Sequence, residues 1–596
     1  MNDDFIKLLV RKRIIQIFVF LFFALIIYEL IKIQIVENIS YLAKSEQNSI
    51  KKMEQQAPRG VFYDRNFKLL VTNKPSFVAI ITPTKYDSKF DSLLENKLQL
   101  DSGYIQKILS QSTTSRFLPI KIKKDIGYDF IAWYEENSDK LPGISYEIEI
   151  QRDYITELSG AHAFGYTKEI TSKQLQDNKE TYSYGDIVGS AGLEKYYEKE
   201  LKGQKGISYI LVDSKQRVIG KYADGKHDIP PVKGNDLVLS LDYNLQKVAE
   251  ESLEGYRGGV VAIEPKTGEI LVFASSPTFN LSQFAGSISP ETWQTLLNDP
   301  KKPLFNRVSS ANYSPGSSYK MVLALAGLEE KIITTSWTIG CGGGLLFGNK
   351  FFACTHAHGS VNVTRAIEGS CNTFFYQLML KIGLANWAKY SRLLGFGSKT
   401  GIDFPEDNAG LIPDSNYYDK TYGEGKWRKG FLISLGIGQG ECSVTILQLA
   451  QYAALLANYG ETYKPHLVKG VIQNETQNYI PLKFKKIKVP ISKNTFDIVR
   501  DGMYRVVHGN GTARSVLIPG ITIAGKTGTV QNPHGANHAV FIAFAPYDDP
   551  KIAVAVLIEN VGFGATYAAP IARRIIQEYL GLKEQNIELV DTTKVN

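Results

Sequence analysis

The longest apolar run of the chain lies close to its start. IIQIFVFLFFALIIY fills residues 14–28, and continued past Glu29 and Lys32 it reaches the ~20 residues that a helix needs to cross a bilayer. No small-x-small cleavage site follows, which favours an uncleaved anchor at residues 14–34 over a cleaved signal peptide. The basic residues within 1–13 predict a cytoplasmic tail, so all later residues are expected outside the cytoplasm.

Residues 35–230 alternate short β-rich runs with polar segments rich in lysine and tyrosine, and they contain no catalytic constellation. This pattern is typical of a scaffold. Three phrases stand out within it: RGVFYDRN at residues 59–66, GAHAFGY at 160–166 and GLEKYYEKELKGQKG at 192–206. Each of them, taken alone, fits an ordinary turn or helix surface.

The pattern changes at the two prolines of DIPPVKG, where we expect a linker and then a second domain over residues 231–585. DLVLSLD predicts a strand, YNLQKVAEESLEGY a helix, and GGVVAIEPKTGEILVFASS a hairpin. Towards the end, GITIAGKTGTVQ, AVFIAFAPY and KIAVAVLIEN predict three strands before the helix APIARRIIQEYLG. Strands from both ends around a helical middle predict an α+β fold with one antiparallel sheet flanked by helices, and a tail at 586–596.

Composition adds little to this picture. The chain of 596 residues is too long for one core, and its 43% hydrophobic and 21% charged residues are ordinary for folded domains. Its net charge of +8 arises from 68 basic and 60 acidic residues without a basic block. Nucleic-acid binding is therefore disfavoured.

A candidate nucleophile lies in YSPGSSYKMVLALAGLEE, where Pro315 and Gly316 precede an apolar-periodic helix. Ser317 falls at the start of this helix and Lys320 lies one turn later, so the lysine amine can face the hydroxyl. A neighbouring amine and the helix dipole can activate a serine without histidine. The spacing alone is weak evidence, because it also occurs at Ser49.

Lys-Thr-Gly occurs three times, and context separates the copies. Lys266 lies in the predicted hairpin turn and Lys399 lies between a helix and a loop. Lys526 follows ITIAG on a predicted strand, where Gly528 allows another backbone to approach closely, as a strand that binds an extended peptide requires.

Ser-x-Asn occurs four times, beginning at Ser310, Ser360, Ser370 and Ser492. The third copy follows VNVTRAIEG and precedes the apolar TFFYQLMLKIG. A loop between two helices there can project polar groups into a cleft.

Three of these motifs, in this order and context, resemble the active-site motifs of the penicillin-binding proteins and serine β-lactamases. They are Ser317-x-x-Lys320, Ser370-Cys371-Asn372 and Lys526-Thr527-Gly528-Thr529. The anchor and the phrases RGVFYDRN, GLEKYYEKELKGQKG, LFNRVSSANYSPGSSYK and SLGIGQG are similar to the class B penicillin-binding protein 2 group of rod elongation, over nearly the whole chain. The resemblance implies a non-catalytic pedestal or dimerisation-type domain before a transpeptidase domain.

The resemblance also implies a role for each motif residue. Ser317 would attack the penultimate D-Ala carbonyl of a donor stem peptide, and Lys320 would take its proton. Ser370 would relay a proton to the leaving D-Ala, and Asn372 would hold the substrate amide. Some members of the family carry aspartate where this chain has Asn372, which leaves the role of that residue open, although asparagine supplies both a donor and an acceptor.

The strand motif would bind the substrate. Lys526 and Thr527 would hold the terminal carboxylate. Gly528 follows them on the strand and precedes Thr529. The backbone N–H groups of Ser317 and Thr529 would form the oxyanion hole, in which the loss of one donor typically costs ~3 kcal/mol of transition-state stabilisation.

Three of the four cysteines gather around this region. Cys341, Cys354, His358 and Cys371 supply three thiolates and one imidazole, which is a known tetrahedral zinc set. Outside the cytoplasm a disulfide with one cysteine left over is the alternative. His356 competes as the ligand, but the family phrase resembles HGSVNV beginning at His358, and the resemblance implies a zinc site in this region. Four protein ligands indicate a structural Zn²⁺, which we expect to fix the loop of the Ser-x-Asn motif.

We therefore expect a peptidoglycan D,D-transpeptidase of cell elongation, anchored in a bacterial inner membrane with its catalytic domain in the periplasm and inhibited by β-lactams. The alternatives are a D-Ala-D-Ala carboxypeptidase, a β-lactamase, a septal homologue, or a non-catalytic scaffold or β-lactam sensor. The implied partners are stem peptides, a glycosyltransferase of the shape, elongation, division and sporulation group, and other elongation proteins.

Overall fold

The computed structural model describes residues 3–36, 49–111, 116–117, 119–154, 157–178, 180–183, 185–213, 218–285, 288–533 and 535–582. The tail expected at residues 586–596 lies outside them.

The chain begins with a long apolar helix. Helix α1 runs over Asp3–Ile31 and continues as a π-helical turn at Lys32–Val36. The segment Ile6–Ile35 is long and apolar enough to span a membrane, and none of it is buried within the protein. This agrees with the expected single-pass anchor.

Packing divides the chain into two units that are not continuous in sequence. The small unit comprises residues 1–57, 75–149 and 204–232, and the large unit comprises 58–74, 150–203 and 233–596. The sequence suggested one boundary near residue 231. Two earlier segments nevertheless pack with the C-terminal part, because strand β2 pairs with a strand of that part and Tyr197 Oη donates to Asp403 Oδ2 at 2.7 Å.

The small unit combines sheet and helix. Strands β1, β8 and β9 form an antiparallel sheet. Residues 79–81 of β3 pair with β4, and three helices pack in the core around Ile81. The bounds are β1 Ile50–Gln55, β3 Leu69–Ile81, β4 Ile120–Lys123, β8 Gly206–Val212, β9 Val218–Lys221, α3 Asp91–Lys97, α4 Tyr104–Gln111 and α5 Tyr128–Asn137.

Two phrases noted in the sequence meet inside the large unit. The guanidinium of Arg59, from RGVFYDRN, donates to the carboxylate of Glu194, from GLEKYY, at 2.8 Å, and Arg152 Nε donates to the same carboxylate at 2.6 Å. Both phrases thus build the core. The elements here are β2 Phe62–Tyr63, β5 Ile144–Tyr154, α6 Ala161–Phe164, β6 Thr167–Glu169, α7 Ser172–Asp177, β7 Ile187–Gly189, α8 Gly192–Tyr196 and α9 Glu198–Leu201.

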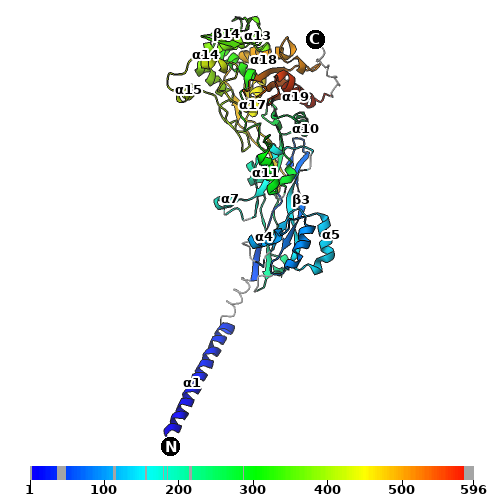
Figure 1. Ribbon diagram of the computed structural model, residues 1–596, viewed down its shortest axis with the longest axis vertical. Coiled ribbons are helices and arrows are strands. Elements are labelled where there is room, and N and C mark those ends of the chain that lie inside the picture. The colour runs from blue at the N-terminus through cyan, green and yellow to red at the C-terminus, as the bar shows by residue number, and fades with distance from the viewer. Residues whose placement is uncertain are drawn as a thin grey trace. The chain divides into compact units, whose positions relative to one another are not determined.

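The predicted antiparallel sheet forms the centre of the large unit. Its strand order is β12-β11-β23-β22-β21, so strands from both ends of the domain pair as expected. Every position of β11 and β23 is buried, so helices cover both faces. Figure 1 shows α10, α17 and α19 around this sheet. The bounds are β10 Asp236–Leu239, α10 Tyr243–Ser252, β11 Gly258–Ile263, β12 Ile270–Ser276, α17 Ile446–Ala457, β21 Ala524–Val530, β22 His538–Ala545, β23 Ile552–Ile558 and α19 Gly564–Tyr579.

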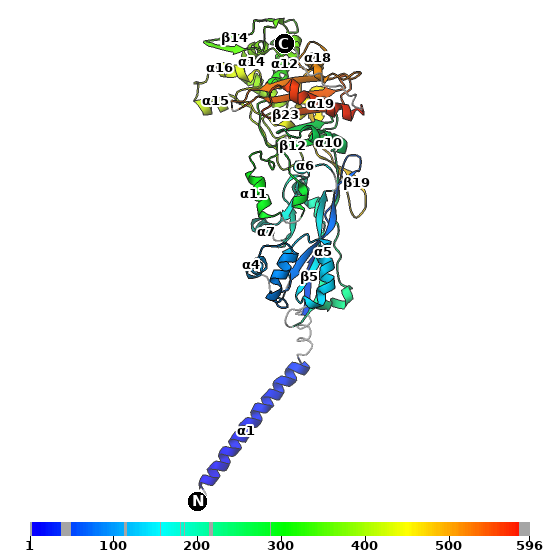
Figure 2. The same cartoon turned by 45° about the vertical axis from the view of Figure 1, so that its right-hand side comes forward.

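The helical middle packs beside the edge strand β21. Helix α12 packs on α14, α13 packs on α18, and α18 packs on β21. A hairpin of β14 and β15 lies next to α14 (Figure 2). The bounds are α11 Pro290–Asn298, α12 Lys320–Glu329, β13 Ile339–Cys341, β14 Gly344–Phe347, β15 Lys350–Ala353, β16 Gly359–Val361, α13 Val363–Glu368, α14 Asn372–Leu393, α15 Ser415–Tyr422, α16 Gly430–Leu435, β17 Glu461–Tyr463, β18 Val468–Ile472, β19 Tyr479–Pro481, β20 Lys486–Lys488 and α18 Lys493–His508.

Candidate active site

Ser317 lies on a tight turn that leads into α12. A 3-10 helix covers Gly316–Tyr319, and α12 begins at Lys320, so the serine stands at the helix start as expected. Gly316 N–H donates to Gly438 O at 2.8 Å, within the SLGIGQG phrase. A Cβ at Gly438 would lie 2.3 Å from Gly316 O, so glycine is required for this close approach. The phrase therefore holds the serine turn in place.

Lys320 points into the protein and is fully buried. Its Nζ donates to Ser370 O at 2.7 Å, to Ser370 Oγ at 3.1 Å and to Asn372 Oδ1 at 2.7 Å. All three acceptors are uncharged. Burial, opposed only in part by the nearby Cys354 and Cys371 sulfurs, lowers the pKa of Lys320 to about 7. The lysine can therefore exist as a neutral amine near neutral pH and accept a proton.

Ser370 joins α13 to α14 in a strained conformation. The predicted loop between two helices is a tight turn, in which Ser370 has φ +57°, in the left-handed region. This turn sends Ser370 and Asn372 to Lys320 while Cys371 contributes to the cysteine group. A non-glycine residue in this region typically costs ~1–3 kcal/mol, and such residues cluster at functional sites.

Asn372 uses both ends of its amide. Its Oδ1 accepts from Lys320, and its Nδ2 donates to Ala353 O at 3.3 Å. An aspartate could accept from the lysine but could not donate to the carbonyl. The asparagine of this chain thus links the buried lysine to β15 without adding a charge.

Lys526 and Thr527 lie on β21, the edge strand of the sheet, as the sequence predicted. Lys526 is fully buried, and its Nζ donates to Thr527 O at 3.0 Å. Burial, and then the charge of Lys320, lower its pKa well below the usual range. A Cβ at Gly528 would lie 3.2 Å from Pro315 O, so the backbone that approaches this glycine is the chain's own serine turn. Thr529 follows on the same strand.

The competing copies of these motifs lie elsewhere. Lys52, the partner of Ser49, is on β1 and not on a helix. Lys266 is in the β11–β12 turn and forms an ion pair with Asp549, and Lys399 follows α14 in a loop. Their contexts match the expectation.

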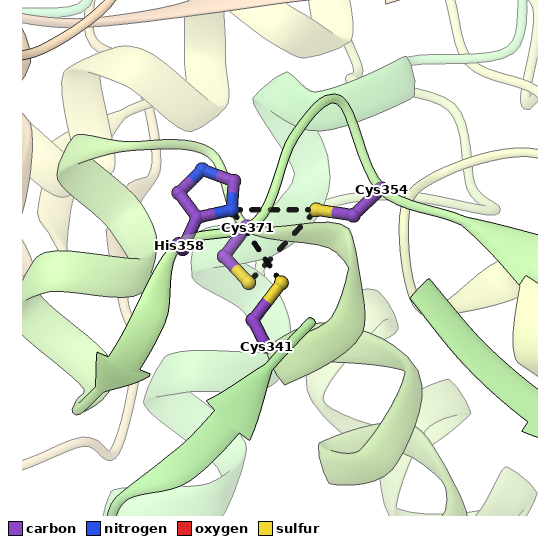
Figure 3. A group of neighbouring side chains, drawn as sticks. All are labelled: Cys341, Cys354, His358 and Cys371. Carbon is purple, nitrogen blue, oxygen red and sulfur yellow. Dashed lines mark hydrogen bonds between the residues drawn. The ribbon is translucent and has the colours of Figure 1, made fainter. Parts of the chain in front are cut away.

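The structure brings Cys341, Cys354, His358 and Cys371 together beside this site (Figure 3). Their four ligand atoms lie within 4.8 Å of one another. His358 Nδ1 is 3.6 Å from Cys341 Sγ and 3.5 Å from Cys354 Sγ, and the sulfurs of Cys354 and Cys371 are 4.0 Å apart. In a tetrahedral zinc site neighbouring ligand atoms are separated by about 3.5–3.8 Å. The donor set therefore fits zinc in both chemistry and spacing.

The hydrogen bond of His358 and the unpaired sulfurs are compatible with metal binding. His358 Nε2 lies 2.9 Å from Gly369 O; donation to this carbonyl leaves the Nδ1 lone pair free for a metal. The structure leaves all four cysteines of the chain unpaired, without the alternative disulfide. The ring of His356 lies beside that of His358, but His356 is outside the group.

The cysteine group contacts the Ser-x-Asn motif directly. Asn372 N–H donates to Cys354 Sγ at 3.2 Å, and Thr373 Oγ1 lies 3.2 Å from Cys341 Sγ. Cys371 separates Ser370 from Asn372 in the sequence. Anything that fixes the sulfurs also fixes the two partners of Lys320.

Sequence reasoning missed one polar residue at this site. Thr512 Oγ1 lies 2.6 Å from Thr527 Oγ1 and comes from the loop that follows α18. The sequence signal is the glycine-rich HGNGTA that precedes the Lys-Thr-Gly strand. Such a loop is a common carrier of binding residues.

The sequence matches two known family models. A family model described as the penicillin-binding protein transpeptidase domain matches residues 258–577, and one described as the penicillin-binding protein dimerisation domain matches residues 54–239. The chain belongs to the penicillin-binding protein family. This assignment confirms the expected α+β fold and the enzyme class, a serine-type D,D-transpeptidase of the penicillin-binding proteins.

The similarity to individual penicillin-binding proteins extends over most of the chain. The peptidoglycan D,D-transpeptidase MrdA of Acinetobacter baumannii is 33% identical over 93% of this chain and 85% of the relative, and that of Escherichia coli is 30% identical over 98% and 96%. A structure of the Helicobacter pylori penicillin-binding protein PBP2 with MreC matches with a TM-score of 0.77 and 30% identity, covering 89% of this chain and 99% of that one. The resemblance to the penicillin-binding protein 2 group is thereby confirmed.

Proposed function

We propose that this chain cross-links peptidoglycan stem peptides during cell elongation, with Ser317 as nucleophile and Lys320 as its general base. The observation that carries this proposal is the environment of Lys320. A fully buried amine with three uncharged partners and a pKa of about 7 is suited to accept a proton from a hydroxyl one turn away.

In the acylation step, Ser317 Oγ attacks the penultimate D-Ala carbonyl while its proton passes to Lys320 Nζ. A neutral amine has two protons and one lone pair, so Lys320 can keep two of its three hydrogen bonds and use the lone pair for this proton. The proton returns to the leaving D-Ala nitrogen through Ser370 Oγ, which is 3.1 Å from Lys320 Nζ. The C–N bond breaks and an ester to Ser317 remains.

In the second step, an amine of a neighbouring stem peptide attacks the ester and releases Ser317. Attack by water would instead make the same site a carboxypeptidase. Lys526 and Thr527, on the edge strand, are suited to hold the terminal carboxylate of the donor, since an edge strand can pair with an extended peptide.

The cysteine group would hold one structural Zn²⁺ through Cys341, Cys354, His358 and Cys371. When bound, the metal would supply cross-linking of the loops and no open coordination position for chemistry. The bond from Asn372 N–H to Cys354 Sγ supports a role in holding the Ser-x-Asn motif. Metal analysis of the purified protein should find one zinc per chain; no zinc, together with a Cys341–Cys354 disulfide, would contradict this assignment.

The helix Ile6–Ile35 supports an inner-membrane anchor with the catalytic domain in the periplasm, where the substrate lies. One similar structure is a complex of PBP2 with MreC, which supports elongation-complex proteins as partners. Another is described as a peptidoglycan synthase complex that coordinates polymerization and crosslinking, which supports a glycosyltransferase as a partner. Depletion in cells should give round cells; filaments would indicate a septal role.

Replacement of the nucleophile tests the chemistry. Ser317→Ala should abolish labelling by a fluorescent penicillin and turnover of a donor peptide. Ser318→Ala is the matched control, because Ser318 is the adjacent serine and its hydroxyl is bonded to Pro315 O. If Ser317→Ala is still labelled, or if it supports rod shape in cells, the proposed catalytic role is wrong. A label that persists for minutes fits a transpeptidase, and rapid release fits a β-lactamase.

A further inference from the structure

Thr512 is an exposed threonine placed against the strand that carries Thr527. Its Oγ1 lies 2.6 Å from Thr527 Oγ1. Among the residues that the structure describes, no other group hydrogen-bonds to the Thr527 hydroxyl. Two hydroxyl groups from different elements therefore stand side by side at the edge of the sheet.

The loop that carries Thr512 is held by its backbone on both sides. Asn510 N–H donates to Glu368 Oε1 at 2.8 Å, and Ala513 N–H donates to Val506 O at 3.0 Å. A Cβ at Gly511 would lie 2.3 Å from Val506 Cα, so this position requires glycine to let the loop lie against α18. The place of Thr512 is thus fixed by main-chain packing and does not depend on its side chain.

Glu368 also relates this loop to the rest of the site. It is the last residue of α13, the helix that leads into Ser370. The carboxylate of Glu368 thereby ties the Thr512 loop to the element that carries the Ser-x-Asn motif. The three motifs and this loop are parts of one connected arrangement.

A pair of hydroxyl groups has one proton more than its internal hydrogen bond needs. Each hydroxyl offers one proton and two acceptor sites, and the bond between Thr512 and Thr527 uses one proton. An anionic ligand with two oxygens can take both protons and replace one neutral hydrogen bond by two charge-assisted ones. Lys526 precedes Thr527 on the strand, and its Nζ donates to Thr527 O at 3.0 Å.

We propose that Thr512 is a further substrate-binding residue, whose hydroxyl binds one oxygen of the donor peptide's terminal carboxylate while Thr527 binds the other. This inference rests on the proposed function, because it assigns the carboxylate to the same site. It adds a residue that lies outside the three motifs.

The test uses the full-length protein in detergent and two acyl-D-alanyl thioester substrates that differ at one group, a terminal carboxylate or the corresponding carboxamide. For Thr512→Val, the acylation rate constant should fall about ten- to hundredfold with the carboxylate substrate, the typical worth of one hydrogen bond to a charged group. It should change less than about twofold with the carboxamide. Thr512→Ser should keep the wild-type preference.

Thr476→Val is the control, because Thr476 is an exposed threonine bonded to Gln473 in the turn between β18 and β19. It should leave both rates unchanged. If Thr512→Val lowers the melting temperature, Thr512→Ala and Thr512→Ser are compared in the same way, since these variants differ by a hydroxyl.

Equal losses with both substrates, or no loss with either, would overturn the role of Thr512. Failure of the underlying function has a different signature: Ser317→Ala would still be acylated by both substrates. The two failures are therefore separate outcomes of one set of measurements.

Discussion

Two sites in the large unit bury basic side chains, and they shift the pKa of Arg59 and of Lys320 in opposite directions. Arg59 and Arg152 meet the carboxylate of Glu194 at 2.8 and 2.6 Å, and its side chain is fully buried. Burial alone would lower the pKa of Arg59, but Glu194 and Glu198 raise it above its usual range. Lys320 is equally buried, yet it meets only uncharged acceptors, and its pKa is lowered to about 7.

The difference separates structure from chemistry. A buried cation with an acid partner stays charged and joins segments, whereas a buried cation without one is ready to lose its proton. Phrases that resemble the family can therefore stabilise the fold without taking part in the reaction. Arg59 and Glu194 join segments of the fold, whereas Lys320 keeps a desolvated amine, as its proposed role of general base requires.

The largest expected effect is on catalysis and comes from Lys320. Lys320→Met should lower the acylation rate constant by about 10³-fold, because no other group replaces a positioned general base. Its melting temperature should rise, because an unpaired buried cation is removed. Stopped-flow labelling with a fluorescent penicillin and thermal melting measure the two effects. A variant that loses activity only because it melts earlier would break the distinction.

Glu194→Gln should lower the stability of the fold and leave the acylation rate nearly unchanged. It removes the negative partner of Arg152 and one of the two negative partners of Arg59, and breaking such a buried ion pair typically costs about 3–5 kcal/mol of folding free energy. Denaturant unfolding measures this loss. The acylation rate of the folded fraction should stay within about twofold of wild type. The matched control is Glu147→Gln, which changes an acidic side chain that is 36% exposed in the small unit.

Loss of one sulfur should have a smaller effect on the same lysine site. Cys354→Ser should release the proposed zinc and lower acylation about tenfold, because Asn372 loses the sulfur that its N–H contacts. Elemental analysis and labelling kinetics measure both changes. Cys442→Ser is the control: Cys442 is buried, but it is not part of the group. Unchanged kinetics in a zinc-free variant would show that the metal does not support Asn372.

The smallest change adds a charge beside Lys320. Wild-type acylation should rise as the pH increases through about 7, because only the neutral amine accepts a proton. In Asn372→Asp a carboxylate replaces the amide oxygen that lies 2.7 Å from Nζ, which stabilises the charged amine and should raise its pKa by about 1–3 units. The rising limb should move to higher pH.

Asn362→Asp is the matched control for this profile, because Asn362 caps α13 and contacts no catalytic group. Its profile should coincide with that of wild type. An unmoved limb in Asn372→Asp would mean that Lys320 does not control the pH dependence.

Much of the site could be predicted because it depends on local pattern. Ser317 and Lys320 are one turn apart at the start of an apolar-periodic helix, and Lys526 follows the apolar ITIAG that predicts its strand. The helix dipole and the i, i+3 geometry are properties of the segment itself. The same holds for the anchor, which needs only length and apolarity.

Other features depend on contacts between distant segments. The contact of Ser370 with Lys320, the position of Thr512 beside Thr527 and the joining of Arg59 to Glu194 each require a partner far away in the chain. The packing units are also discontinuous, since residues 58–74 and 150–203 complete a core formed mainly by later residues. No local periodicity records such long-range pairing.

The sequence by itself determined the kinds of group that are present: a serine and lysine on one helix, three thiols with an imidazole, and an apolar helix of membrane length. The tertiary structure decided their chemical state. Lys320 has a pKa of about 7 because the fold buries it against Ser370 and Asn372 and supplies no carboxylate there, whereas Arg59 receives one. Desolvation and charge pairing are properties of the packed environment, and only folding creates that environment.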